Sequence, residues 1–194
     1  MTDAVPPAAP AAPGARPVVV ERVEERLRSA DLDDLCGVTA DAIREGGGFG
    51  WVAPPPRDVM ERFWRGIVMV PGRTLFLGRL DGVVCGSLQL VRPPGNNEAQ
   101  AFAASLTTCF VAPWARGHRV GRGMVAAAEA LAREEGFKLL NLDVRATQTA
   151  AIALYRSAGF RQWGENPYYA MVGGRTVAGL YFHKPLVPEL GEPS

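Results

Sequence analysis

The sequence predicts a mixed α/β fold with one central sheet. Runs of β-branched and apolar residues, each of strand length, alternate with longer runs in which apolar residues recur at helical spacing. Residues 74–91 also carry a hairpin pattern, because Asp81-Gly82 separates two apolar runs and suits a two-residue turn. We therefore expect about six or seven strands in a sheet flanked by about four helices.

The first half of the chain supplies one strand and two helices before the hairpin. Residues 18–23 are β-branched and predict a strand. Residues 29–44 carry an apolar stripe, with Ser29 or Asp31 as the candidate N-cap, and predict a helix that ends at three glycines. Residues 57–69 repeat apolar side chains four apart with charged residues between them, which predicts a second helix.

The second half alternates strands with helices. In order, the predicted elements are a strand at 101–111, a helix at 124–135, a strand at 138–145, a helix at 147–158, and strands at 160–163 and 177–183. Thr147 is the candidate N-cap of the last helix, and Gly159 is expected to end it. The segment between the last two strands is rich in turn residues and is predicted to be a loop.

The length of the chain, 194 residues, is enough for one domain with a substantial core. We expect that domain to span residues 17–187. Residues 1–16 are rich in Pro and Ala, predict a disordered tail, and lack the basic start of a signal peptide. Residues 188–194 are expected to be a short C-terminal tail.

Composition argues against several classes of partner. The formal net charge is +1 at pH 7 and no apolar run reaches the ~18–20 residues of a membrane span, so we expect neither nucleic acid nor a membrane. The three cysteines are widely spaced and there are two histidines, so we expect neither disulfides nor a metal. Reduced cysteines indicate a cytoplasmic protein. Abundant arginine and alanine beside two lysines indicate a bacterial one.

A turn rich in glycine and arginine, residues 111–124, joins an apolar strand to an alanine-rich helix. The free N–H groups and the dipole at the start of a helix attract anions. Glycine lets the backbone approach a bulky anion, and arginine suits phosphate oxygens. The turn contains Gly117, Gly121, Gly123, Arg116, Arg119 and Arg122. The sequence therefore predicts a phosphate-binding cradle here.

Two motifs resemble those of GNAT-type N-acetyltransferases. Residues 116–123, Arg-Gly-His-Arg-Val-Gly-Arg-Gly, resemble the family's pyrophosphate signature Arg/Gln-x-x-Gly-x-Gly/Ala, with Arg119 where the family usually has glycine. Residues 144–160 resemble Val-x-x-x-Asn-x-x-Ala-x-x-Leu-Tyr-x-x-x-Gly-Phe, with Gln148 in place of asparagine. The resemblance covers roughly residues 75–186.

The resemblance implies a GNAT-like fold, with a central, mixed, mostly antiparallel twisted sheet. It also implies transfer of an acetyl group from acetyl-CoA to a primary amine by direct attack in a ternary complex, without a metal. In such proteins the strand before the cradle pairs with the pantetheine arm, and the cradle holds the pyrophosphate. The residues that the resemblance assigns to acetyl-CoA are Phe110, Val111, Arg116, Gly117, His118, Arg119, Val120, Gly121, Arg122, Gly123 and Gln148.

The catalytic residues are less clearly marked. Tyr155 matches the family tyrosine that returns a proton to the leaving thiolate. In many relatives a glutamate on the strand before the cradle acts as the general base. Residues 101–111 of this chain contain no acidic residue. Glu98, just before that strand, is the candidate base; Glu165 is an alternative.

The acceptor side is expected to include Phe49, Trp51 and Tyr168. The apolar loop around Phe49 and Trp51 has no acidic cluster, which favours a small amine without high positive charge. A homodimer remains open, since many relatives are dimers.

Other functions remain open. The protein could acetylate a peptide or protein N-terminus or a lysine, or could bind acyl-CoA as a sensor without turnover. A Rossmann-type nucleotide-binding protein is disfavoured, because its glycines should follow the first strand of the fold.

Overall fold

The computed structural model describes residues 16–47, 50–188 and 190. Its strands form one seven-stranded sheet in the order β1-β2-β3-β4-β5-β7-β6. The strands are β1 (Val18–Val23), β2 (Arg73–Leu80), β3 (Val83–Val91), β4 (Ala103–Val111), β5 (Leu139–Arg145), β6 (Arg161–Val172) and β7 (Arg175–Pro185). The helices are α1 (Ser29–Arg44), α2 (Arg57–Met69), α3 (Val120–Glu134) and α4 (Thr149–Ser157), with short 3₁₀ turns η1 (Glu98–Gln100) and η2 (Pro113–Ala115). The expected mixed, mostly antiparallel sheet with four helices is confirmed.

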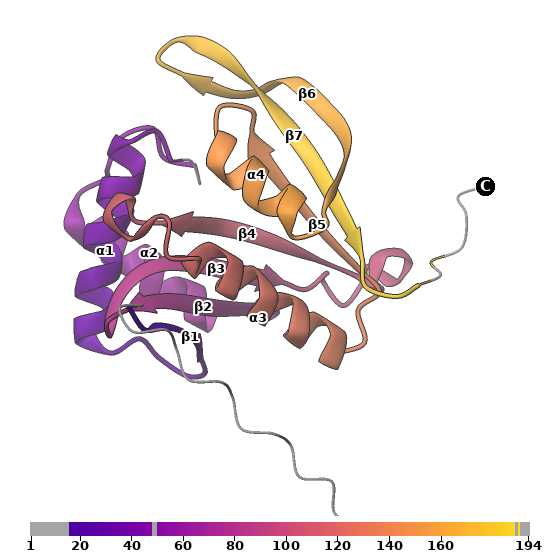
Figure 1. The fold of residues 1–194 in the computed structure, drawn as a ribbon, viewed down its shortest axis with the longest axis horizontal. Helices are drawn as coiled ribbons and strands as arrows, with labels where there is room; N and C mark the ends of the chain where they lie inside the picture. Colours follow the sequence, from indigo (N-terminus) through magenta and orange to yellow (C-terminus); the bar gives the residue numbers. More distant parts are fainter. Residues whose placement is uncertain (1–15, 48–49, 189, 191–194) are drawn as a thin grey trace, which may run out of the picture.

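Helices cover both faces of the sheet. Figure 1 shows α3 crossing in front of β1, β2 and β3, with α2 behind them. On the α2 side, the fully buried Trp64 donates its indole N–H to Thr39 Oγ1 of α1 at 3.2 Å, and its ring centroid lies 6.3 Å from that of Phe110 in β4. On the α3 side, a Cβ on Gly78 would lie 2.4 Å from Val120 Cγ1. Glycine at this position of β2 therefore lets the start of α3 pack directly on the sheet.

The sheet opens between β4 and β5. These parallel strands pair only over Ala103–Ser105 and Leu139–Asn141. On its other edge β4 stays paired with β3 as far as Val111, with a bulge between Ser87 and Gln89. Thr108 sits in that bulge with φ at 51°, and its carbonyl accepts a hydrogen bond from Ser87 Oγ at 3.0 Å. Because a bulge bends its strand, the last residues of β4 turn away from β5 and do not pair with it.

Several local expectations are confirmed and others are wrong. The β2–β3 turn has positive φ at Asp81 and Gly82, as the Asp-Gly pattern predicts. No side chain caps α1 or α4; their N-caps are Arg28 and Gln148. The carboxylate of Asp31, a predicted cap, instead accepts a hydrogen bond from Arg28 Nε at 2.7 Å.

Two boundaries differ from the prediction in ways that matter for the site. Helix α3 begins at Val120 rather than Met124, so part of the cradle is already helical. The predicted loop around Tyr168 is strand, because β6 continues to Val172 through an irregularity between Asn166 and Ala170. Its pairing with β7 supplies backbone partners that the local sequence does not reveal.

Some expectations fall outside the described residues. They concern the tail at residues 1–15, Phe49, and residues 189 and 191–194. In the part of the chain that the structure describes, no helix has the length and apolar character needed to cross a bilayer.

Candidate active site

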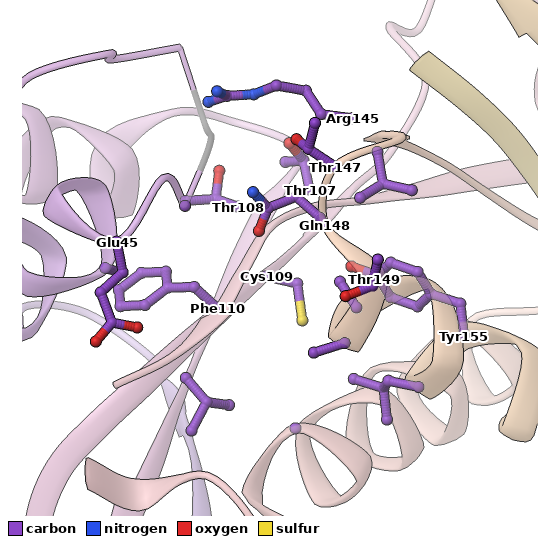
Figure 2. A pocket seen from close by; sticks show the side chains of 18 of the residues that line it. Glu45, Thr107, Thr108, Cys109, Phe110, Arg145, Thr147, Gln148, Thr149 and Tyr155 are labelled. Carbon is purple, nitrogen blue, oxygen red and sulfur yellow. The ribbon is translucent and has the colours of Figure 1, made fainter. Parts of the chain in front are cut away.

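A cavity of about 990 Å³ occupies the opening between β4 and β5. Its walls come from the second half of β4, the start of α3, the end of β5, the start of α4, the end of α1 and part of β6. Figure 2 shows side chains from β4, β5 and α4 converging on this space. The volume is at the upper end of the range for small-molecule and cofactor sites.

Most of the predicted site residues meet at this cavity. Those that line it are Phe110, Val111, Arg116, Gly117, Arg119, Val120, Gly121, Arg122, Gln148 and Tyr155. Those outside its lining are His118, Gly123, Trp51, Tyr168 and Glu98. Most of the predicted cofactor residues thus line one cavity together with Tyr155. Glu98, Trp51 and Tyr168 do not line it.

The start of α3 presents free backbone donors to the cavity. Among the described residues, none accepts a hydrogen bond from the N–H groups of Val120, Gly121 or Arg122. Gly123 differs, because its N–H donates to the Arg119 carbonyl at 3.0 Å. A Cβ on Gly123 would also lie 3.2 Å from Val20 Cγ2, so this glycine serves packing against β1. The run of N–H groups without a described acceptor therefore ends at Arg122.

The cradle carries a local excess of positive charge. Arg116 Nη1 forms an ion pair with Glu45 Oε2 at the end of α1, at 2.7 Å. Arg119 and Arg122 are exposed, and no described residue forms an ion pair with them. Two unpaired guanidinium groups beside free N–H groups fit the phosphates of a nucleotide cofactor.

Gln148 spans the cavity mouth. This residue is the N-cap of α4, and its Nε2 donates to the Gly46 carbonyl at 2.5 Å. The amide therefore lies where it can contact a ligand threaded between β4 and α4.

Arg119 occupies a strained position. Its φ of 63° places it in the left-handed region as the N-cap of α3. This conformation costs about 1–2 kcal/mol for a residue with a Cβ. The cost gives a physical reason for the glycine that the family signature has at this place.

Arg119→Gly should stabilise the protein by about 0.5–1 kcal/mol. Relief of the strain outweighs the ~0.5–1 kcal/mol of extra chain entropy that glycine loses on folding. Thermal unfolding should show a Tm higher by about 1–4 °C. Arg119→Ala keeps the strain and should show no such gain. Equal stabilisation by both substitutions would mean that the backbone conformation is not the cause.

Tyr155 is the buried phenol of the site. It lies on α4 with 5% of its surface exposed, and its ring packs edge-on against Phe160 at 5.9 Å. Burial, followed by the neighbouring Cys109 thiol, raises the pKa of Tyr155 well above its ordinary value of 10. The hydroxyl is therefore protonated at any working pH and can donate a proton inside the cavity.

Cys109 faces that hydroxyl from β4. Burial raises the pKa of Cys109 to about 11, and the hydrogen bond from Tyr155 offsets only part of this effect. The side chain is a neutral thiol at neutral pH, so it is poorly suited to act as a nucleophile.

The acidic residue that faces the cavity from β5 is Asp143, which the sequence prediction missed. Its carboxylate accepts a hydrogen bond from the Tyr169 hydroxyl of β6, and both residues line the cavity. The predicted base, Glu98, is exposed in η1, before the start of β4 and away from the cavity. The spacing of Asp143 and Arg145 is the signal that could have revealed this residue. Residues two apart on a strand share a face, so the two charged side chains lie on the same face of β5.

Gly179 of β7 makes the contact between Tyr169 and Asp143 possible. The Tyr169 ring crosses β7 at this glycine, where an added Cβ would lie 2.1 Å from Tyr169 Cγ. The irregularity of β6 between Asn166 and Ala170 places Tyr169 there.

Gly179→Ala should destabilise the protein by about 1–3 kcal/mol, because the new methyl group overpacks against the ring. In a Tyr169→Ala background the same substitution should cost much less, since the ring is gone. Chemical denaturation of the four proteins in this double-mutant cycle measures the difference. Equal costs in both backgrounds would contradict the contact.

Of the predicted acceptor residues, Trp51 and Tyr168 lie outside the cavity lining, and Phe49 is outside the described residues. Trp51, which is partly buried, packs edge-on against Phe63 of α2 with ring centroids 4.7 Å apart. Tyr168 is 78% exposed on β6, and its neighbour Tyr169 points into the cavity instead. In residues 16–47, 50–188 and 190, no group of three or more His, Cys, Asp or Glu side chains is arranged to hold a metal.

The architecture defines a class of enzyme. The part of β4 that turns away from β5 can pair with the amides of an extended arm, the cradle can hold phosphates, and a neutral phenol lines the same cavity. Coenzyme A combines such an arm with such phosphates. These features together define a coenzyme A-dependent acyltransferase.

Comparisons with known proteins agree with this class. The acetyltransferase (GNAT) family model matches residues 40–160. A protein of Azospirillum brasilense, described as an uncharacterized N-acetyltransferase in the hisH-hisA intergenic region, is 60% identical over 131 residues, 68% of this chain and 77% of that protein. The chain therefore belongs to the acetyltransferase (GNAT) family, and the expected acetyl-CoA-dependent acyltransferase is confirmed.

Solved structures show the same fold. An N-acetyltransferase from Staphylococcus aureus Mu50 has a TM-score of 0.74 at 16% identity, over 88% of this chain and 99% of that chain. A phosphinothricin acetyltransferase from Sinorhizobium meliloti, solved in complex with acetyl-CoA, has a TM-score of 0.72 at 19% identity, over 91% of this chain and 93% of that chain.

Proposed function

We propose that this enzyme transfers the acetyl group of acetyl-CoA to the primary amine of a small molecule, by direct attack within a ternary complex. The observation that carries the proposal is the opening of the sheet between β4 and β5, a cavity that both Tyr155 of α4 and Asp143 of β5 line. Both reactants can meet in this cavity without a covalent acetyl-enzyme, and Cys109, a neutral thiol, is not needed as a nucleophile.

Acetyl-CoA would enter from the cradle. Its pyrophosphate would accept hydrogen bonds from the N–H groups of Val120, Gly121 and Arg122. Its pantetheine arm would lie along the end of β4 at Phe110 and Val111, beyond the part of β4 that pairs with β5, while Gln148 contacts the arm from α4. The role of the cradle is supported by its three N–H groups, for which no described residue is an acceptor, and the role of β4 by the opening of the sheet beside it.

Two protons must move. An alkylammonium with a pKa of ~10.4 is neutral in only about one molecule in two thousand at pH 7. Asp143 would take the proton of the acceptor, directly or through water. Tyr155 would give a proton to the departing coenzyme A thiolate. Each transfer is typically worth about 10²–10⁴ in rate.

The test is release of coenzyme A thiol from acetyl-CoA in the presence of a panel of small amines, peptides and a lysine-rich protein. Release with small amines supports the proposal. Release only with peptides or protein would replace the small-molecule acceptor by a macromolecular one. Saturable binding of acetyl-CoA without release to any acceptor would favour an acyl-CoA sensor.

The proposal places the reaction in the bacterial cytoplasm. The three cysteines, Cys36, Cys85 and Cys109, are all free thiols, as expected for a reducing compartment.

A further inference from the structure

Arg145 is a buried cation that the reaction scheme above does not use. It ends β5, is 8% exposed, and lines the cavity. Its guanidinium makes no hydrogen bond or ion pair with any of the residues that the structure describes. In Figure 2 the side chain extends from the end of β5 over the cavity, toward the side that α1 forms.

A guanidinium without a partner is costly in a side chain that is largely buried. Arginine does not lose its proton in proteins, so it cannot escape burial by becoming neutral. A buried charge is normally paired and hydrogen-bonded. The same molecule provides the contrast, because Arg79, equally buried, pairs with Glu21 at 2.7 Å and with Asp31 at 2.8 Å. Arg145 therefore has the character of a group whose partner is a ligand.

The anion that Arg145 would bind does not belong to the pantetheine arm, which carries no charge. The phosphates of acetyl-CoA would lie at the start of α3, and Figure 2 shows Arg145 on the other side of the cavity from that helix. The remaining candidate is the acceptor.

The position of Arg145 relative to Asp143 fixes the kind of acceptor. The two residues share one face of β5, with Cα atoms about 6.6 Å apart. The Tyr169 hydroxyl, which donates to Asp143, also lies in the electrostatic field of Arg145. A carboxylate and a guanidinium at this spacing match a molecule that carries an ammonium and a carboxylate close together.

We infer that Arg145 binds a carboxylate of the acceptor, so that the acceptor is an α-amino acid or a close zwitterionic analogue. This inference rests on the proposed function, since it names the substrate class of the same cavity. A peptide N-terminus fits less well, because its α-carboxylate has become an amide that a cation does not attract.

The test compares amino acids with their amides and with the matching decarboxylated amines, in the thiol-release assay. The unsubstituted enzyme should prefer amino acids. Arg145→Gln should raise the KM for the amino acid about 30-fold or more, because it removes one partner of a buried charge pair. Its kcat, its Kd for acetyl-CoA and its KM for the amides should change little. Arg161→Gln, which removes an exposed arginine of β6 outside the cavity, is the matched control.

A second readout does not depend on turnover. Without ligand, Arg145→Gln should raise the Tm by about 2–4 °C, because it removes an unpaired buried charge. An amino acid added with coenzyme A should raise the Tm of the unsubstituted protein but not that of Arg145→Gln.

The outcomes separate this inference from the proposed function. Thiol release that is equal for amino acids and their amides, with no effect of Arg145→Gln on KM, would overturn the inference and leave the proposed function standing. Release confined to peptides and unaffected by Arg145→Gln would overturn it as well. No release with any acceptor, together with binding of amino acids that depends on Arg145, would overturn the proposed function and support the carboxylate site. No release and no such binding would overturn both.

Discussion

Tyr155→Phe should lower kcat by about 10²-fold, and at least tenfold, while changing the Kd for acetyl-CoA by less than about twofold. The substitution removes the proton donor for the leaving thiolate, and such donors are typically worth about 10²–10⁴ in rate. The ring itself is retained, with its edge-on contact to Phe160 and its tilted contact to Phe182. Steady-state thiol release at saturating acetyl-CoA gives kcat, and titration of the cofactor gives Kd.

The pH profile provides the control for this prediction. Burial holds the pKa of Tyr155 well above 10, so the hydroxyl stays protonated throughout the range from pH 6 to pH 10. Any loss of kcat on the alkaline side below pH 10 must therefore arise from another group. An unchanged kcat in Tyr155→Phe, or an effect confined to the KM for acetyl-CoA, would reduce Tyr155 to a packing role.

The same shift has a consequence for stability. The folded-state pKa lies above the unfolded-state value of 10, so the neutral hydroxyl contributes fully below pH 10 and its contribution is lost as the pH rises beyond that value. Above pH 10, the free energy of unfolding of Tyr155→Phe should therefore fall less with rising pH than that of the unsubstituted protein.

Local sequence patterns were sufficient where the element depends on local chemistry. The Asp81-Gly82 turn, the stripe of α2 and the β-branched run of β1 each carry their signal within a few residues. The start of α3 does not. The two glycines among residues 119–123 lower the helix propensity of the segment, whereas close packing on Gly78 makes it helical from Val120.

Strand β6 shows the same limit. Asn166 and Pro167 indicate a loop when read alone. The structure keeps them in the strand because β7, which follows in sequence and folds back beside it, pairs on both sides of the irregularity. A partner strand of this kind is a tertiary feature that propensity does not contain.

The site divides along the same line. The predicted cofactor residues lie within short segments that follow the family motifs, and most of them line one cavity in the structure. The proton-handling side combines Asp143 of β5 with Tyr169 of β6, and Gly179 of β7 lets them meet. In the sequence, residues 138–145 have a nearly continuous apolar pattern. That pattern correctly indicates a buried strand, but it does not reveal that Asp143 and Arg145 form part of a cavity wall.

Asp143→Asn should lower kcat/KM by at least about 10²-fold at pH 7, because the acceptor loses the group that takes its proton. The amide is close in size to the carboxylate and can still accept a hydrogen bond from Tyr169, so the fold should be retained. The loss should be larger for an amine with a pKa of ~10.4 than for one with a pKa of ~7.8, because far less of the former is neutral at pH 7. Initial rates with the two kinds of amine measure this difference.

The pH dependence of the activity should show whether Asp143 acts as the general base or only as a hydrogen-bond partner of Tyr169. The residual activity of Asp143→Asn should climb by about tenfold per pH unit up to the pKa of the amine, since the neutral fraction of the amine grows by that factor. Tyr169→Phe removes the hydrogen bond but keeps the carboxylate, so it should lose less activity and show a flatter profile. Glu98→Gln alters an exposed carboxylate away from the cavity, and it should change neither the activity nor its dependence on pH. If Glu98→Gln instead reproduces the loss and the pH dependence expected of Asp143→Asn, the base would be Glu98, and the cavity seen between β4 and β5 would have to rearrange when substrates bind.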